Sequence, residues 1–179
     1  MGKITVILIL GTALAVGAGI WYTQTRAYYA PVDGPVTLTI DGRDGLAALP
    51  ATDIRAIASS ASPLGFRACF TLDGDPDALA AELSPAPRGD AAPTIAPGWF
   101  DCFDAGEVEA MLIQGTATAY TAYPNAQYGV DRMVALAQDG RGWVWHQLND
   151  CGDKAYDGTP VGPSCPDRDT FQPLVEGSF

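Results

Sequence analysis

The chain opens on an unbroken apolar stretch, after which short apolar runs alternate with polar turns. The stretch Ile4–Tyr22 contains 19 residues and no charge. At a helical rise of about 1.5 Å per residue it crosses a hydrocarbon core of about 30 Å. Trp21 and Tyr22 close it, and aromatic residues of this kind gather at membrane interfaces. We predict a single transmembrane anchor over residues 1–28.

A cleaved signal peptide is the alternative interpretation of the same stretch. Lys3 supplies a charged start, and the small residues at 17–19 offer a cleavage site. The apolar run does not stop there, however, but continues through Ile20 into the aromatic pair. This continuation favours an anchor that stays attached.

The pattern after the anchor predicts one α+β domain over residues 29–179, a length typical of a single domain. Alternating apolar positions predict strands at 36–40 and 66–72, and further strands follow at 116–123, 131–137 and 143–148. The last two strands are joined across Asp139–Gly142, and Asp followed by Gly is a strong hairpin signal. Residues 124–129 are predicted as a turn.

Helices are predicted at 52–59, 75–83 and 105–114. Asp75 and Asp104 supply N-caps for the second and third helices, and Gly115 ends the third. The proline-rich stretch Ser84–Pro97 reads as a surface loop. We therefore expect an antiparallel sheet of four or five strands with two or three helices on one face.

The cysteines indicate the compartment. All four, Cys69, Cys102, Cys151 and Cys165, follow the anchor, without a C-x-x-C motif and with one histidine in the whole chain. Zinc ribbons, thioredoxin-like sites and attached haem are thus unsupported, and two structural disulfides are the simplest account. Such disulfides place residues from about 27 onward outside the cytoplasm.

Four cysteines permit three connectivities. We favour Cys151 with Cys165, because closing a loop of about 15 residues contributes roughly 3 kcal/mol and the 151–165 loop has little apolar content to order it otherwise. This choice leaves Cys69 with Cys102.

The charge balance is strongly acidic. The chain has 21 Asp and Glu and 10 Lys and Arg, of which Lys3 and Arg26 belong to the anchor, so the domain carries a net charge of about −13. Nucleic acid is a poor partner for such a field, whereas a basic protein is attracted to it. Solubility alone is the simpler meaning of the acidity.

Two further sets of residues suggest contact surfaces. Gly11, Ala15 and Gly19 recur every four residues and form a smooth helix face suited to packing against other transmembrane subunits. The aromatic residues are core by default, but they also form a candidate docking patch. Its members are Trp99, Phe100, Trp143 and Trp145.

His146 is the centre of the one constellation with acid–base potential. Its candidate partners are four aspartates, two arginines that could hold an anion, and a serine nucleophile: Asp101, Asp104, Asp131, Asp150, Arg67, Arg132 and Ser62. No nucleophile elbow and no calcium-loop motif accompanies them. We favour a structural role for His146 and expect no metal and no cofactor.

Four segments together resemble an uncharacterised family of small single-anchor membrane proteins from alphaproteobacteria. They are Ser62–Phe70 (SPLGFRACF), Pro97–Asp104 (PGWFDCFD), Gly129–Arg132 (GVDR) and Trp145–Gly152 (WHQLNDCG). The resemblance implies an inner-membrane protein with a periplasmic domain, and no activity. Some members carry a histidine-kinase label, which this sequence does not support, since it has no Gly-rich nucleotide loop.

These features lead to an expectation about function. We expect a non-enzymatic accessory subunit of an energy-transducing membrane complex, in electron transfer of respiration or photosynthesis, whose acidic domain could guide a basic periplasmic electron carrier. An envelope assembly or biogenesis factor that meets its client transiently is the second hypothesis. A periplasmic hydrolase using His146 is the third.

Overall fold

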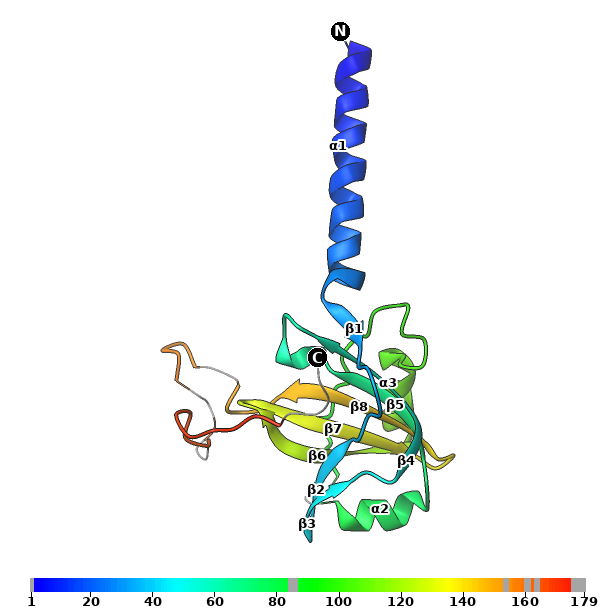
Figure 1. Cartoon of the computed structure of the whole chain (residues 1–179), viewed down its shortest axis with the longest axis vertical. Coiled ribbons are helices and arrows are strands. Elements are labelled where there is room, and N and C mark those ends of the chain that lie inside the picture. Colours follow the sequence, from blue (N-terminus) through cyan, green and yellow to red (C-terminus); the bar gives the residue numbers. More distant parts are fainter. Residues whose placement is uncertain (1, 84–86, 153–154, 160–161, 163–164, 175–179) are drawn as a thin grey trace.

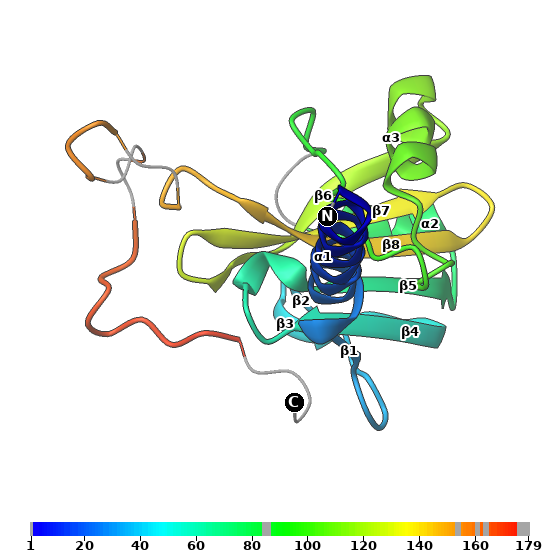
Figure 2. The same ribbon diagram turned by 90° about the horizontal axis from the view of Figure 1, so that it is seen from above.

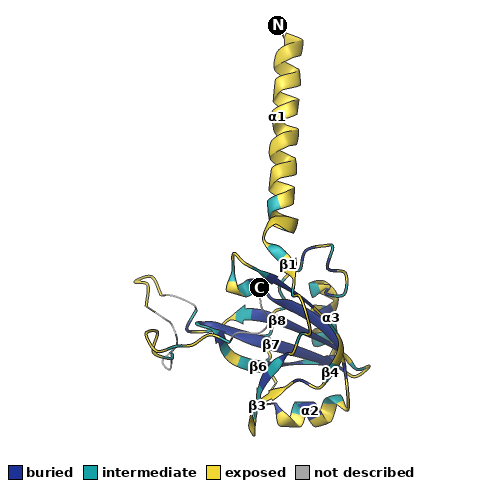
Figure 3. Ribbon diagram, viewed as in Figure 1, coloured by how far each residue is buried: buried dark blue, intermediate teal, exposed yellow. Residues whose placement is uncertain are grey.

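A long N-terminal helix stands clear of a sheet-rich domain (Figure 1). The computed structural model describes all residues except 1, 84–86, 153–154, 160–161, 163–164 and 175–179. Helix α1 (Gly2–Tyr22) continues into a π-helical turn at Thr23–Ala27, and every residue of α1 is exposed (Figure 3). The helix is long and apolar enough to cross a membrane, as the sequence predicts.

The domain is built on a six-stranded antiparallel sheet and a separate two-stranded hairpin. The sheet has the order β1 (Tyr29–Pro31), β4 (Ala51–Ser59), β5 (Arg67–Leu72), β8 (Arg141–Leu148), β7 (Val130–Ala137), β6 (Ala117–Gln127). The hairpin pairs β2 (Thr39–Gly42) with β3 (Gly45–Ala48). Two α-helices complete the domain, α2 (Pro76–Glu82) and α3 (Ala105–Gln114). The predicted α+β class is confirmed, with six strands in the main sheet.

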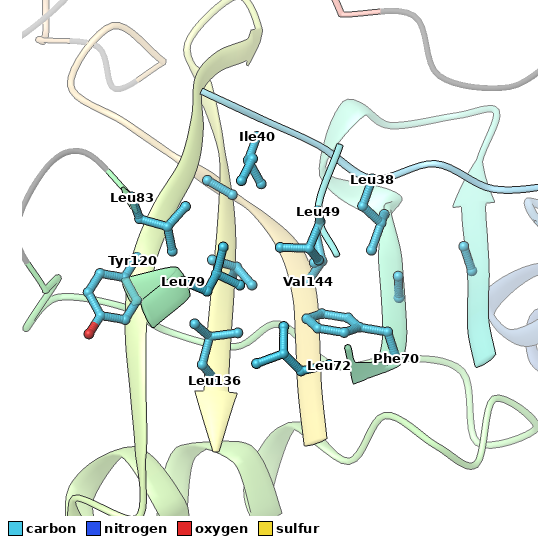
Figure 4. Packing of buried hydrophobic residues seen from close by; sticks show 14 of the residues in the cluster. Leu38, Ile40, Leu49, Phe70, Leu72, Leu79, Leu83, Tyr120, Leu136 and Val144 are labelled. Carbon is cyan, nitrogen blue, oxygen red and sulfur yellow. The ribbon is translucent and has the colours of Figure 1, made fainter. Parts of the chain in front are cut away.

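The sheet is covered on both faces, so every residue of the interior strand β7 is buried. One face packs against the β2–β3 hairpin and α2, which contributes Leu79 (Figure 4). The opposite face packs against α3, which contributes Val108, and against the loop that contains Phe100. Figures 1 and 2 show the hairpin and α2 on the side of the sheet away from α1. The expectation that the helices share one face is therefore wrong.

The helix predicted at 52–59 is wrong, because the segment forms strand β4. Its β-branched residues Thr52, Ile54 and Ile57 suit an extended chain. Pairing with β1 on one side and β5 on the other overrides the helical spacing of the apolar positions. A bulge between Thr52 and Arg55 interrupts the second pairing, and Asp53 takes a left-handed φ of 51° there.

Two predicted boundaries also differ from the structure. The strand expected at 36–40 begins only at Thr39, because its partner β3 is four residues long. The turn expected at 124–129 is shorter, since β6 runs on to Gln127 through two irregularities in its pairing with β7. Asn125 takes a φ of 50° in this part of β6.

The local signals at the helix ends and in the terminal hairpin are confirmed. The carboxylate of Asp75 accepts a hydrogen bond from the Asp77 amide, and that of Asp104 accepts from the Gly106 and Glu107 amides. Gly115 ends α3 with a φ of 72°. Strands β7 and β8 pair across the predicted turn.

Both predicted disulfides are present. Cys69 on β5 is bonded to Cys102, 33 residues later, and Cys151 is bonded to Cys165, 14 residues later. The first bridge ties the sheet to the loop that precedes α3. The second closes the 151–165 loop, in which residues 153–154, 160–161 and 163–164 lie outside the described part of the chain.

Two other segments form backbone hydrogen bonds with the outer edge of β6. The Arg88 amide donates to the Ala119 carbonyl at 2.8 Å, and the Leu174 amide donates to the Ala126 carbonyl at 2.8 Å. The loop after α2 and the C-terminal segment therefore both lie along this edge.

The two disulfides should contribute differently to stability. Replacing Cys69 and Cys102 together by Ala should lower the free energy of unfolding by about 4 kcal/mol, because this bridge joins distant parts of the core. Replacing Cys151 and Cys165 by Ala should lower it by less than about 3 kcal/mol, since that loop can open without the sheet. Urea unfolding followed by tryptophan fluorescence measures both, and equal losses would contradict the expectation.

Candidate functional site

The histidine singled out by the sequence lies in a buried stack of three side chains. His146 on β8 is 5% exposed, and it pairs across the sheet with Arg132 on β7. Its ring stacks on Phe66, which immediately precedes β5, at a centroid distance of 5.1 Å. The Arg132 guanidinium lies over the same phenyl ring at 4.8 Å. Three neighbouring strands thus bring a cation, an aromatic ring and an imidazole together.

Both ring nitrogens of His146 have a protein partner. Nδ1 lies 2.6 Å from the Pro63 carbonyl oxygen, which can only accept, so Nδ1 carries the proton and donates it. Nε2 is then the acceptor for the Nε–H of Arg132, at 3.4 Å. The imidazole is neutral in this arrangement, and it links the sheet to the 3₁₀ turn at Pro63–Gly65.

The surroundings oppose protonation of this histidine. Burial, together with the positive charges of Arg132 and Arg67, lowers the pKa of His146 from 6.5 to about 3, although the hydrogen bond to Pro63 acts in the opposite direction. A general base works best when its pKa lies near the working pH. His146 in this state is a weak base and a good neutral hydrogen-bonding link.

A cavity of about 480 Å³ opens beside the stack. The Ser59–Pro63 segment forms one wall, and Gln127, Arg132 and His146 contribute to the rest. Ser62, the candidate nucleophile, lines this cavity, but its hydroxyl oxygen accepts a hydrogen bond from the Leu64 amide and caps the 3₁₀ turn. The structure therefore brings Ser62, Arg132 and His146 to one cavity, as the constellation requires.

The candidate aspartates lie elsewhere. Asp101 forms an ion pair with Arg55 at 2.6 Å, and Asp104 caps α3. Asp131 accepts hydrogen bonds from the Asn149 side chain at 2.6 Å and the Asn125 amide at 2.9 Å. Asp150 is exposed and borders a separate cavity that Asp131 also lines. Each of these carboxylates has another place in the fold, so none of them orients His146.

Arg67 also differs from the anion-holding role considered for it. Its side chain is 3% exposed, and burial lowers its pKa to about 10. Its guanidinium donates to the carbonyls of Leu64 and Phe66, both at 2.5 Å, and to those of Thr94 at 2.8 Å and Ile95 at 3.4 Å. Arg67 therefore fixes two loops to the start of β5.

Three of the four candidate docking aromatics lie inside the protein. Trp145, Trp143 and Phe100 are 0%, 3% and 5% exposed, and they pack in the cluster between the sheet and α3. The prediction of a docking patch is thus wrong for these three residues, because α3 and the preceding loop cover this face of the sheet. Trp99 is half-buried, and its indole nitrogen donates to the Thr25 carbonyl at 2.5 Å.

Two further points concern the small residues of α1 and possible metal ligands. Gly11, Ala15 and Gly19 are exposed on α1, and no neighbouring atom would meet a side chain added at Gly11 or Gly19. Within the described residues, no group of three or more His, Cys, Asp or Glu side chains is placed to hold a metal ion.

One polar cluster has no clear signal in the sequence. Arg88, in the proline-rich loop, donates to the Thr121 hydroxyl at 2.9 Å, pairs with Asp90 at 2.7 Å and reaches Asp131 at 3.4 Å. Gln147 holds the same loop through its side-chain amide and the backbone of residues 90 and 92. The predicted surface loop is therefore tied to the sheet by side-chain hydrogen bonds.

The low pKa of His146 predicts a pH-dependent stability. The unfolded histidine, with a pKa near 6.5, binds a proton more readily than the folded one, with a pKa of about 3. The stabilisation is therefore complete above pH 6.5 and is lost as the pH falls towards 3. Between pH 7 and pH 4 the free energy of unfolding should drop by on the order of 3 kcal/mol from this residue alone.

The matched control is His146→Asn, which keeps an N–H donor for the Pro63 carbonyl but does not titrate. Urea unfolding at a series of pH values separates histidine from the carboxylates, whose contributions are shared by both proteins. The variant should show the shallower pH dependence, and equal slopes would contradict the burial of a neutral imidazole.

Comparison with known proteins identifies a family and no activity. No curated protein and no solved structure matches the chain significantly. The family of unknown function DUF6446 matches residues 36–166, which include the whole β2–β8 region, the His146 stack and both disulfides. Since this match covers well over half of the sequence, the chain belongs to that family.

Proposed function

We propose that this protein is a non-enzymatic accessory subunit of a membrane-embedded complex, held in the bilayer by α1. The observation that carries the proposal is the isolation of α1: all its residues are exposed, and its own domain covers none of them. An anchor only needs to be apolar. This one also has the small residues Gly11, Ala15 and Gly19 along one face, where another helix can approach closely.

The proposed location is the bacterial inner membrane, with the domain in the periplasm. The two disulfides support an oxidising compartment, and the resemblance to single-anchor alphaproteobacterial proteins supports this membrane. Both ring nitrogens of the neutral His146 have hydrogen-bond partners, and the candidate aspartates lie away from it, which favours a binding role over hydrolysis.

The proposed complex is an energy-transducing one, and the acidic end of the domain supports this choice. Figure 1 shows the β2–β3 hairpin and α2 at the end of the molecule farthest from α1. Exposed carboxylates gather on these elements and on the adjoining turn, namely Asp44, Asp73, Asp75, Asp77 and Glu82. A basic electron carrier such as cytochrome c, diffusing in the periplasm, would meet this end first.

The helix-packing part of the proposal is tested by native gel electrophoresis after mild detergent extraction. The wild-type chain should migrate with partner subunits, and Gly11→Ile or Ala15→Ile should reduce the amount of partner at least about fivefold, because a bulky side chain separates the helices.

Ala13→Ile and Gly17→Ile are the matched controls, because they place the same side chain on the opposite side of α1. These variants should keep the partner. A wild-type chain that migrates alone would contradict the subunit role, and equal effects on both sides of the helix would contradict the small-residue face.

The acidic end predicts salt-dependent association with a basic protein. A basic cytochrome c should bind the full chain in nanodiscs with an affinity that falls at least about tenfold between 50 and 200 mM salt. The triple variant Asp44→Asn, Asp73→Asn, Glu82→Gln should weaken binding at low salt, as surface plasmon resonance would show. Neutralising Glu109, Asp150 and Asp169 removes the same charge elsewhere, and an equal effect would show that only net charge matters.

A further inference from the structure

One loop of the domain combines an uncharged sequence with a highly exposed apolar side chain. The ten residues from Ala91 to Phe100 contain no charged side chain, although the chain carries 21 acidic residues. Ile95 in this loop is 83% exposed, a large apolar side chain left in the open. The first carboxylate after the loop, Asp101, is paired with Arg55 at 2.6 Å. The loop is therefore suited to contact with an apolar environment from which charged groups are excluded.

The loop holds a fixed conformation. The Arg67 guanidinium donates to the Thr94 and Ile95 carbonyls, at 2.8 and 3.4 Å, from a position that is 3% exposed. The Ala92 amide donates to the side-chain oxygen of Gln147 at 2.8 Å. The exposure of Ile95 thus belongs to a held loop, in which the apolar side chain cannot simply turn inward.

The same loop is bonded to the base of the membrane helix. The indole nitrogen of Trp99 donates to the Thr25 carbonyl at 2.5 Å, and the Arg26 guanidinium lies 5.3 Å from the centre of the Trp99 ring. Figure 1 shows the loop, in green, on the side of the sheet that faces α1. The loop and the anchor therefore meet at one level.

That level can be placed relative to the bilayer. Thr25 lies three residues beyond Tyr22, at most about 4.5 Å along the helix axis. Each interfacial layer between the hydrocarbon core and water is about 5–7 Å thick. If Tyr22 marks the edge of the core, Trp99 falls within the headgroup layer, where amphipathic indole rings are favoured.

We propose that the Ala91–Phe100 loop is a second membrane contact, which places Ile95 and the Trp99 ring in the interfacial layer of the bilayer that α1 spans. The domain is then held to the bilayer at two points, α1 and this loop, so it keeps one face towards the lipid. Lipid is the occupant that the observations favour, because the loop is uncharged, carries an outward apolar side chain and is joined to a transmembrane helix.

The test uses the full chain in phosphatidylcholine nanodiscs with a nitroxide at position 95, attached through a ketone-bearing amino acid so that the four cysteines stay paired. Collision rates with oxygen and with a water-soluble nickel chelate report depth, because oxygen concentrates in lipid and the chelate does not enter it. Leu46, which is 65% exposed on β3 at the far end of the domain, is the matched control position.

The oxygen-to-nickel ratio should be at least about threefold higher at position 95 than at position 46. With the label at Gly98 instead, Ile95→Asp should lower the ratio at least about twofold, whereas Ile95→Val should leave it unchanged. Equal ratios at 95 and 46 would overturn the proposal. Protection of position 95 from both reagents would overturn it as well, since this result indicates a covering protein surface.

Discussion

The backbone pairing between β1 and β4 is the constraint on which the placement of the whole domain depends. Strand β1 starts at Tyr29, two residues after the π-helical turn of the anchor ends, and it pairs with Ser59, Ala58 and Ile57 of β4. The Val32 amide extends this contact to the Ala56 carbonyl. No flexible linker separates the helix from the sheet, so the fold itself decides which loops face the membrane. The Trp99 contact with Thr25 adds a second link at the same junction.

Inside the domain, the polar groups that stay buried hold loops in place. Arg67 is bonded to carbonyls of two loops, and His146 joins the Pro63 turn to the sheet through its Nδ1–H. Buried cations and imidazoles are costly unless they are hydrogen-bonded, so these contacts are strongly constrained by geometry. These hydrogen bonds explain why the loops contacted by Arg67 and His146 keep a defined conformation.

Local signals in the sequence predicted local structure well. The caps at Asp75 and Asp104, the stop at Gly115 and the hairpin at 139–142 each depend on a few neighbouring residues, and all are confirmed. The cysteine pairing followed from loop length. The helix predicted at 52–59 is wrong because the apolar spacing fits a helix, whereas the segment is hydrogen-bonded between two strands, β1 and β5.

The candidate site was predicted only in part, for the same physical reason. The sequence names Ser62, Arg132 and His146, which share a cavity, but it cannot show that the aspartates are engaged by Arg55, Asn125 or Asn149. The burial of Trp143 and Trp145 depends on α3 covering the second face of the sheet. Ion pairs and layer order are decided by the tertiary fold, which periodicity along the chain does not encode.

The bonded edge of β6 has a consequence for a protein confined to two dimensions. Copies tethered to one bilayer meet far more often than copies free in solution, and exposed strand edges would then join into intermolecular sheets. Here carbonyl groups of one outer strand, β6, accept hydrogen bonds from the Arg88 and Leu174 amides, and the other outer strand, β1, is three residues long and ends in proline. At high density in the membrane, neighbouring copies therefore meet few unpaired strand edges with which they could form an intermolecular sheet.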